Sequence, residues 1–310
     1  MRAARGDRER PAAAGRPGAP PRHRRRTQPR RDRAVLLTEL PADQPPVTLH
    51  WLRVGHCVQI EGLARKGAPL RRIEFPSYAA AIGHPDHGWT LFDTGYADHF
   101  FTATQRLPAR LYRELLPVTL PDDQHLPDQL RGLGIDPLDV RRVVVSHFHG
   151  DHVAGLRDYP NARIYAGAAG GAQITGLKGI NAIRHGLLPA MLPDDLRERL
   201  VAADDLPGGD LLGDGSLVVV PLPGHMPGHL GLVLTATDGR QVLLAGDAAW
   251  FTRSITDLAP PSRLAGIAFD DWTTATGTLG ALHSLHRARP DLLFLPAHCT
   301  AGFDAWHAGL

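Results

Sequence analysis

The segment SHFHGDH, residues 146–152, brings three histidines and an aspartate together directly after the apolar run 143–145. The spacing is H-x-H-x-D-H, formed by His147, His149, Asp151 and His152. Burying so many polar groups without partners would be costly, and an exposed loop would not require them together. Imidazole and carboxylate groups suit zinc, iron or manganese. The pattern therefore predicts a metal site, which can serve two metals if the side chains point to opposite sides.

Four further polar residues follow apolar runs elsewhere in the chain. Asp93 ends the run 89–93 and begins DTGY, and His225 lies in PLPGHMPGH at 221–229. Asp247 lies in AGDAAW at 245–250, and His298 lies in LPAHC at 295–299. Polar residues at strand ends and in the loops that follow them are how α/β folds usually build active sites. These residues are therefore candidates for the same site.

The elements that must position these residues are mainly strands, with helices between them. Apolar and β-branched runs predict strands at 47–60, 71–82, 89–93, 141–145, 217–222, 230–236, 241–245 and 292–295. An Asp-rich start, regularly spaced leucines and the stop at Gly134 predict a helix within 121–135. An amphipathic pattern predicts another helix at 273–288. The mixture indicates the α/β class.

The composition is that of an ordinary soluble globular protein. The chain has 310 residues, of which 43% are hydrophobic and 21% charged. No run approaches the roughly 18 apolar residues of a membrane helix. The two cysteines, Cys57 and Cys299, are far apart and do not form a disulfide framework. We therefore expect a cytoplasmic protein without a membrane partner. The sequence gives no indication of an oligomeric state.

The first 33 residues differ from the rest in charge. Twelve arginines and three acidic residues give this segment a formal charge of +9. Because the whole chain has a formal charge of +2, the remaining residues carry −7. We expect an Arg/Pro-rich disordered extension over residues 1–46 and one folded domain over residues 47–310. One hypothesis makes the extension a nucleic-acid-binding arm. The alternative, which we favour, is a dispensable extension or a coding start placed too far upstream, because the acidic remainder argues against a nucleic-acid partner.

Taken in order, these motifs resemble the metallo-β-lactamase superfamily. The resemblance rests on DTG, H-x-H-x-D-H, and then a distant His, Asp and His, and it runs from about residue 47 to the end of the chain. It includes the lead-in GIDPLDVRRVVVSHFHGDHVAG at 134–155. The fold that it implies is the four-layer αβ/βα sandwich, in which two mixed β-sheets are flanked by helices.

The resemblance also implies a role for each candidate residue. His147, His149 and His225 would bind one metal, Asp151, His152 and His298 would bind the other, and Asp247 would bridge the two. Asp93 would support the ligands without binding metal itself. Two zinc ions are expected, with iron and manganese as alternatives. A hydroxide between the metals would be the nucleophile, and Asp151 would hold it or return a proton to the leaving group.

Within the superfamily, the closest resemblance is to N-acyl homoserine lactonases and related ester hydrolases. Because these relatives act on lactones, the resemblance implies that the substrate of this protein is a small-molecule ester or lactone. Lactonases typically have a tyrosine three residues after the bridging aspartate, where this chain has Trp250. This departure leaves phosphotriester hydrolysis and glyoxalase II-like thioester hydrolysis open as alternatives.

Two segments, 176–212 and 250–272, are predicted to form the substrate pocket. We expect Trp250 and Phe251 in its wall, because aromatic and aliphatic residues suit an acyl or aryl group. Phe100, Phe101 and Tyr112, which follow DTGY, could line the mouth from the opposite side.

Overall fold

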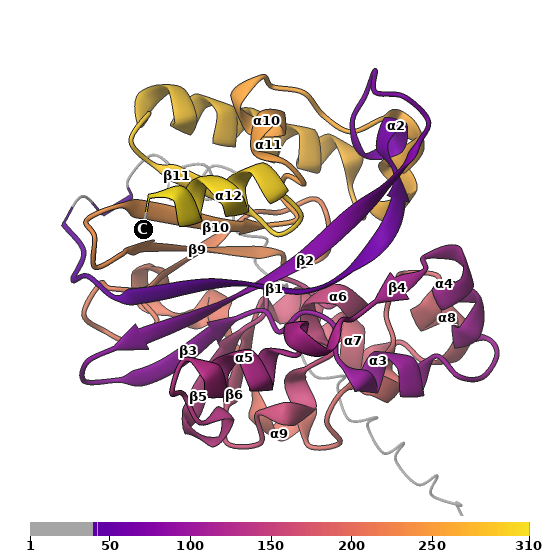
Figure 1. Ribbon diagram of the computed structural model, residues 1–310, viewed down its shortest axis with the longest axis horizontal. Helices are drawn as coiled ribbons and strands as arrows, with labels where there is room; N and C mark the ends of the chain where they lie inside the picture. The colour runs from indigo at the N-terminus through magenta and orange to yellow at the C-terminus, as the bar shows by residue number, and fades with distance from the viewer. Residues whose placement is uncertain (1–39, 42, 310) are drawn as a thin grey trace, which may run out of the picture.

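The computed structural model describes residues 40–41 and 43–309, whose strands form two mixed sheets (Figure 1). The first sheet has seven strands in the order β4-β1-β2-β3-β5-β6-β7, and the second has four in the order β11-β10-β9-β8. The strands of the first sheet are β1 (Thr48–Ile60), β2 (Arg72–His84), β3 (Gly88–Phe92), β4 (Val118–Thr119), β5 (Val140–Val144), β6 (Arg163–Ala166) and β7 (Leu200–Ala202). Those of the second are β8 (Val218–Pro221), β9 (Leu230–Thr235), β10 (Gln241–Gly246) and β11 (Leu293–Pro296).

Helices cover the outer face of each sheet. Those that follow the strands of the first sheet are α2 (Glu61–Ala64), α3 (Asp98–Ala103), α4 (Ala109–Leu115), α5 (Leu126–Gly132), α6 (Gly150–Val153), α7 (Ala168–Gly176), α8 (Gly179–Ile183) and α9 (Leu196–Arg199). Those of the second half are α10 (Thr252–Thr256), α11 (Trp272–Ala288) and α12 (Thr300–Ala308). Figure 1 shows α10 and α11 on one side of the two sheets and α5 and α9 on the opposite side, while α12 contributes Trp306 to the core between the sheets.

Alternation along the strands produces the layers. In β2, Ala79 and Ala81 join a core cluster that includes Leu130 of α5, whereas Tyr78 and Ile82 face the second sheet. In a strand, successive side chains point to opposite faces, so one strand contributes to two cores. The first core lies between the seven-stranded sheet and its helices, and the second lies between the two sheets.

The second sheet repeats this arrangement with its own helices. Leu232 of β9 and Leu244 of β10 pack in the core between the sheets, while Leu243 faces outward. The outward side chains meet the apolar face of α11, which contributes Leu279, Leu282 and Leu285. Three apolar cores between four layers confirm the predicted αβ/βα sandwich.

The packed region begins earlier than the sequence pattern indicated. Leu40 packs against the core of the second sheet, and the Gln44 side chain donates to the backbone oxygens of Gly215 and Val233. Both residues fall within the extension expected at 1–46. Residues 1–39 lie outside the described residues. Over the part of the chain that is described, no helix combines the length and apolar character that crossing a membrane would need.

Candidate metal centre

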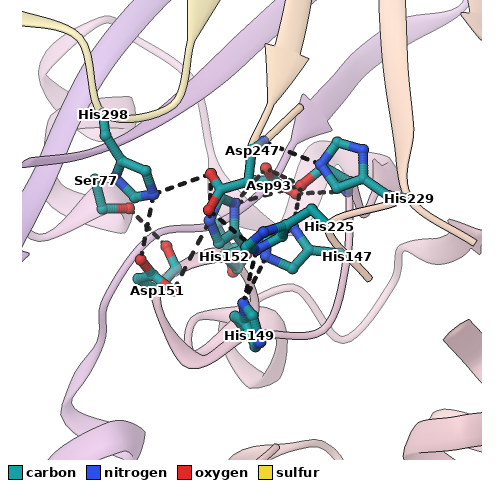
Figure 2. Close-up of polar contacts among 12 residues, drawn as sticks. Ser77, Asp93, His147, His149, Asp151, His152, His225, His229, Asp247 and His298 are labelled. Atoms are coloured by element: carbon teal, nitrogen blue, oxygen red, sulfur yellow. Dashed lines mark hydrogen bonds and ion pairs between the residues drawn. The ribbon is translucent and has the colours of Figure 1, made fainter. Parts of the chain in front are cut away.

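Both sheets contribute residues to one polar cluster at the ends of their strands. His147, His149, Asp151 and His152 follow β5 and lead into α6. From the second sheet, His225 lies between β8 and β9, Asp247 follows β10, and His298 follows β11. These are the seven ligands expected from the sequence, and the fold brings all of them together (Figure 2). Asp151 and Asp247, the expected catalytic residues, lie within the cluster.

One set of ligand atoms comes from His147, His149 and His225. The Nδ1 atom of His149 lies 3.0 Å from Nε2 of His147 and 3.1 Å from Nε2 of His225. Ligands about 2.1 Å from a tetrahedral zinc ion lie about 3.4 Å from one another, so three nitrogens at these separations fit around a single cation.

Asp151, His152 and His298 form a second set. Nε2 of His152 lies 3.8 Å from Oδ1 of Asp151, and Nε2 of His298 lies 3.6 Å from Oδ2 of Asp151. These separations exceed hydrogen-bond length but suit two ligands of a shared cation. The two sets therefore match the division between metals that the family resemblance implied.

Asp247 lies between the two sets, with one carboxylate oxygen facing each (Figure 2). Its Oδ1 is 3.0 Å from Nε2 of His298 and 3.4 Å from Nε2 of His152, while Oδ2 is 3.3 Å from Nε2 of His225. Asp247 Oδ1 and His152 Nε2 are buried and have no hydrogen-bond partner among the described residues. Buried polar atoms need a partner, and a cation between them would satisfy both. The residues present therefore fit a pair of divalent metal ions.

Asp93 contacts the polar cluster through Ser146 and His152. Its Oδ1 accepts a hydrogen bond from the Ser146 N–H at 2.7 Å, and its Oδ2 lies 2.8 Å from Nδ1 of His152. Its backbone has a φ of +58°, a conformation that is strained for residues other than glycine. Strain of this kind persists only where other contacts impose it. Asp93 thus contacts the imidazole of His152 and lies outside the two ligand sets.

Backbone atoms orient two other histidines. Nδ1 of His298 donates to the Pro76 carbonyl at 2.6 Å, and the next residue in β2, Ser77, donates its hydroxyl to the Asp151 carbonyl at 2.6 Å. The backbone of His185 accepts a hydrogen bond from the ring of His149. Such contacts fix which nitrogen of a metal-binding histidine faces the ion.

Gly186 lies directly over the His149 ring. Its φ is +70°, and a Cβ atom there would lie 2.7 Å from Cδ2 of His149. Only glycine combines this backbone conformation with so close an approach. The loop after α8 therefore packs its backbone onto a candidate ligand.

The charges in the cluster divide the histidines into two classes. Burial lowers the pKa of His147, His149 and His225, so these rings stay neutral and able to bind metal. Burial also opposes the charge on His152 and His298, but Asp247 and Asp151 raise the pKa of both rings. Protons on these two rings would have to leave before a cation could bind there.

The same attraction between carboxylates and histidines keeps Asp247 ionised. Burial would raise the pKa of its carboxyl group, but the neighbouring His298, His152 and His225 lower it well below its usual value. His229 accepts a hydrogen bond from the Asp247 backbone N–H on its Nε2 at 3.0 Å. Burial lowers the pKa of His229 to about 3, so it remains neutral in this role.

Trp250 contacts the cluster through its indole nitrogen. Nε1 donates to Oδ2 of Asp247 at 3.0 Å, and the ring packs at an angle to Phe75 and Phe269. The indole N–H at this position is therefore directed at the candidate bridging residue rather than at the open cavity.

A cavity of about 410 Å³ opens onto Asp151, Asp247 and His298. Its wall is mainly apolar and aromatic, with contributions from Phe75, Tyr96, Tyr112, Leu115, Leu116, Ile183, Met226, Trp250 and Phe269. A cavity with these properties suits a small molecule that carries an apolar group.

The cavity wall differs from the sequence expectation in three places. Phe251 does not line the cavity, because its ring packs edge-on against Phe75 with centroids 5.9 Å apart. Phe100 is fully buried in the first core instead of at the mouth. Cys57 does line the cavity, a position that the sequence did not indicate. The alternation of β1 places Cys57 on a buried face but does not indicate what that face meets.

Comparison with known proteins links this site to hydrolases. The chain is 31% identical over 204 residues to N-acyl homoserine lactonase AttM of Rhizobium radiobacter, a match that covers 62% of this chain and 72% of that protein. It is 28% identical over 301 residues to the probable metallo-hydrolase Rv2300c of Mycobacterium tuberculosis, and that match covers 88% of each chain.

Solved structures share the fold at lower identity. An N-acyl homoserine lactone hydrolase with N-hexanoyl-L-homoserine bound at its catalytic metal center superposes with a TM-score of 0.68 and 17% identity, covering 84% of this chain and 97% of that one. AidC, a dizinc quorum-quenching lactonase, gives a TM-score of 0.59 and 14% identity, covering 83% and 89%.

The family model of the metallo-β-lactamase superfamily matches residues 72–289. This span contains six of the seven candidate ligands and most of both sheets. With the lactonase relative, it confirms the family inferred from the sequence motifs. The chain belongs to the metallo-β-lactamase superfamily and is a metal-dependent hydrolase.

Proposed function

We propose that the protein is a dinuclear zinc hydrolase that opens a carboxylic ester or lactone, with an N-acyl homoserine lactone as the first candidate substrate. The observation that carries this proposal is the position of Asp247. Its two oxygens face different ligand sets, as a carboxylate that bridges two cations would require. The lactonase relatives support the choice of substrate class.

Each ligand set would hold one ion. His147, His149 and His225 would hold the first, and Asp151, His152 and His298 the second, with Asp247 shared. When bound, the two ions would supply a water of lowered pKa and would polarise the carbonyl oxygen of the substrate. Neither Cys57 nor Cys299 replaces this chemistry, because both thiols are buried and burial raises the pKa of Cys57 to about 12.

Asp151 is the residue best placed to move a proton. Its carboxylate is 15% exposed and lines the cavity, and its backbone is fixed by the Ser77 hydroxyl. It can accept the proton of the attacking water and return it to the leaving oxygen of the ester or lactone. The apolar wall of the cavity would bind the acyl group and exclude water from the reacting bond.

Metal analysis and a substrate panel test the proposal together. The purified protein would be analysed by mass spectrometry for zinc, iron and manganese, with a metal-free sample reloaded with each ion as a control. The panel would contain an acyl homoserine lactone, an aryl ester, an acyl thioester and an aryl phosphotriester. We expect about two zinc ions per chain and fastest turnover of the lactone or the ester.

Other results of the same panel would select a different function. Preference for the phosphotriester or the thioester would contradict the proposed reaction while leaving the metal centre intact. A single metal ion at full activity would contradict the bridging role of Asp247. Tight nucleic-acid binding by a variant lacking residues 1–33 would exclude the small-molecule assignment.

A further inference from the structure

Apart from Arg184 and His185, which line the cavity but are exposed to solvent, the cavity contains few hydrogen-bond donors that are free to contact a substrate. The indole N–H of Trp250 is directed at Asp247, and the side-chain amide of Gln59 faces the Cys57 thiol at 3.9 Å. The hydroxyl of Tyr96 shares a hydrogen bond with the same thiol. Groups already paired within the wall must lose a partner before they can bind a substrate oxygen.

Tyr112 differs from these residues because its hydroxyl is not paired within the cavity wall. It lies on α4, and Tyr112, Leu115 and Leu116 have the i, i+3, i+4 spacing that places side chains on one face of a helix. All three line the cavity, and the ring of Tyr112 packs edge-on against the buried Phe100 with centroids 6.2 Å apart. Its hydroxyl has no hydrogen-bond partner within the part of the chain that the structure describes.

Tyr112 lines the same cavity as Asp151, Asp247 and His298. After burial, the charge of Asp151 has the largest effect on its phenol, and the charge of Asp247 adds to it. Burial and these negative charges raise the pKa of Tyr112 well above the usual value. The phenol therefore keeps its proton at neutral pH, and its O–H group can donate a hydrogen bond to a substrate oxygen.

We propose that Tyr112 is a catalytic residue whose hydroxyl donates a hydrogen bond to the carbonyl oxygen of the scissile ester or lactone. The proposal rests on the proposed function, because it concerns the oxygen that gains negative charge when that carbonyl is attacked. A donor preset in an apolar cavity stabilises such an oxygen more than water would. Tyr112 would thereby supply from α4 the hydrogen bond that Trp250 cannot supply while it holds Asp247.

The variant Tyr112→Phe tests this role, because it removes only the hydroxyl and keeps the ring against Phe100. With the preferred ester or lactone, we expect kcat to fall by about 100- to 1,000-fold while KM changes less than about threefold, as for the loss of one oxyanion donor. Zinc content and melting temperature should stay at wild-type values. Tyr165→Phe on β6, where the ring packs in the core between the sheets, is the matched control and should leave kcat unchanged.

Three results would overturn the proposal. They are an unchanged kcat in Tyr112→Phe, a loss of zinc from that variant, or a kcat loss that appears in Tyr96→Phe but not in Tyr112→Phe.

A second measurement separates this proposal from the proposed function. A γ-lactam analogue of the lactone keeps the ring carbonyl and resists hydrolysis, so its Kd can be measured by calorimetry.

The lactam measurement gives a defined answer even when no substrate of the panel is hydrolysed. Weaker lactam binding by Tyr112→Phe, by about two- to threefold, would then support the hydroxyl contact although the proposed reaction had failed. Equal Kd values for the variant and the wild type, or no lactam binding by either, would overturn the contact itself.

Discussion

Replacing Trp250 with phenylalanine would remove the indole N–H from Oδ2 of Asp247 while keeping an aromatic ring beside Phe75 and Phe269. That hydrogen bond is 3.0 Å long, is buried and ends on an ionised carboxylate. Hydrogen bonds to charged groups contribute about 1.5–3 kcal/mol, which corresponds to roughly a 10- to 150-fold change in an equilibrium constant. Loss of a residue that orients a metal ligand typically costs about 10- to 100-fold in metal affinity.

We therefore expect Trp250→Phe to bind zinc about 10- to 100-fold more weakly, and at one position more than the other. Oδ2 faces His225, so the position formed by His147, His149 and His225 should weaken most. Titrating metal-free protein with zinc against a chromophoric chelator would measure both affinities.

Trp306→Phe provides the matched control for this measurement. Trp306 is buried, but its Nε1 has no hydrogen-bond partner among the described residues, so its replacement should lower the melting temperature without changing either zinc affinity. Wild-type zinc affinity at both positions in Trp250→Phe would refute the reasoning, because the indole N–H would then have no influence on Asp247.

Three further perturbations probe the same region. Asp247→Ala should remove most activity and at least one equivalent of metal, since it deletes the residue that faces both ligand sets, and elemental analysis would show this; two retained metals would contradict it. Gly186→Ala should weaken zinc binding because its Cβ would lie 2.7 Å from the His149 ring, whereas Gly179→Ala, with φ +56° but open space, should only lower stability; equal zinc affinity in both variants would exclude the steric contact. Cys57, whose pKa burial and the Asp151 charge raise to about 12, should remain a thiol at pH 8 and react with iodoacetamide on the order of 10³-fold more slowly in the folded metal-free protein than in the unfolded chain. Peptide mass spectrometry would measure this, and equal rates would show that the thiol is not protected.

The sequence predicted the fold and the members of the polar cluster well, for a physical reason. The candidate ligands follow strands, and apolar runs such as 217–222 and 241–245 locate strand ends within a residue or two. In the packed sandwich, the residues that follow β5, β8, β10 and β11 meet in one cluster. The assignment of Asp247 to a bridge came only from the family resemblance, since spacing along the chain does not determine which oxygen faces which histidine.

The cavity wall was less predictable because it depends on side-chain direction in irregular segments. Trp250 and Phe251 are adjacent and both aromatic, yet only Trp250 lines the cavity, while Phe251 packs on Phe75. The contact between Gly186 and His149 joins residues far apart in the chain. No local pattern marks it, because a glycine in a loop is ordinary and its meaning appears only when the loop is folded over the ring.

The order of the ligands along the chain separates the two metal positions in time. The set of His147, His149 and His225, with Asp247, is complete once β10 has been synthesised, whereas the other set also needs His298, which follows α11 and β11. If the residues bind metal as proposed, a growing chain would capture its first ion while the second position still lacked a ligand. The two positions would then be filled at different stages of biosynthesis, the second only after β11 has paired with β10.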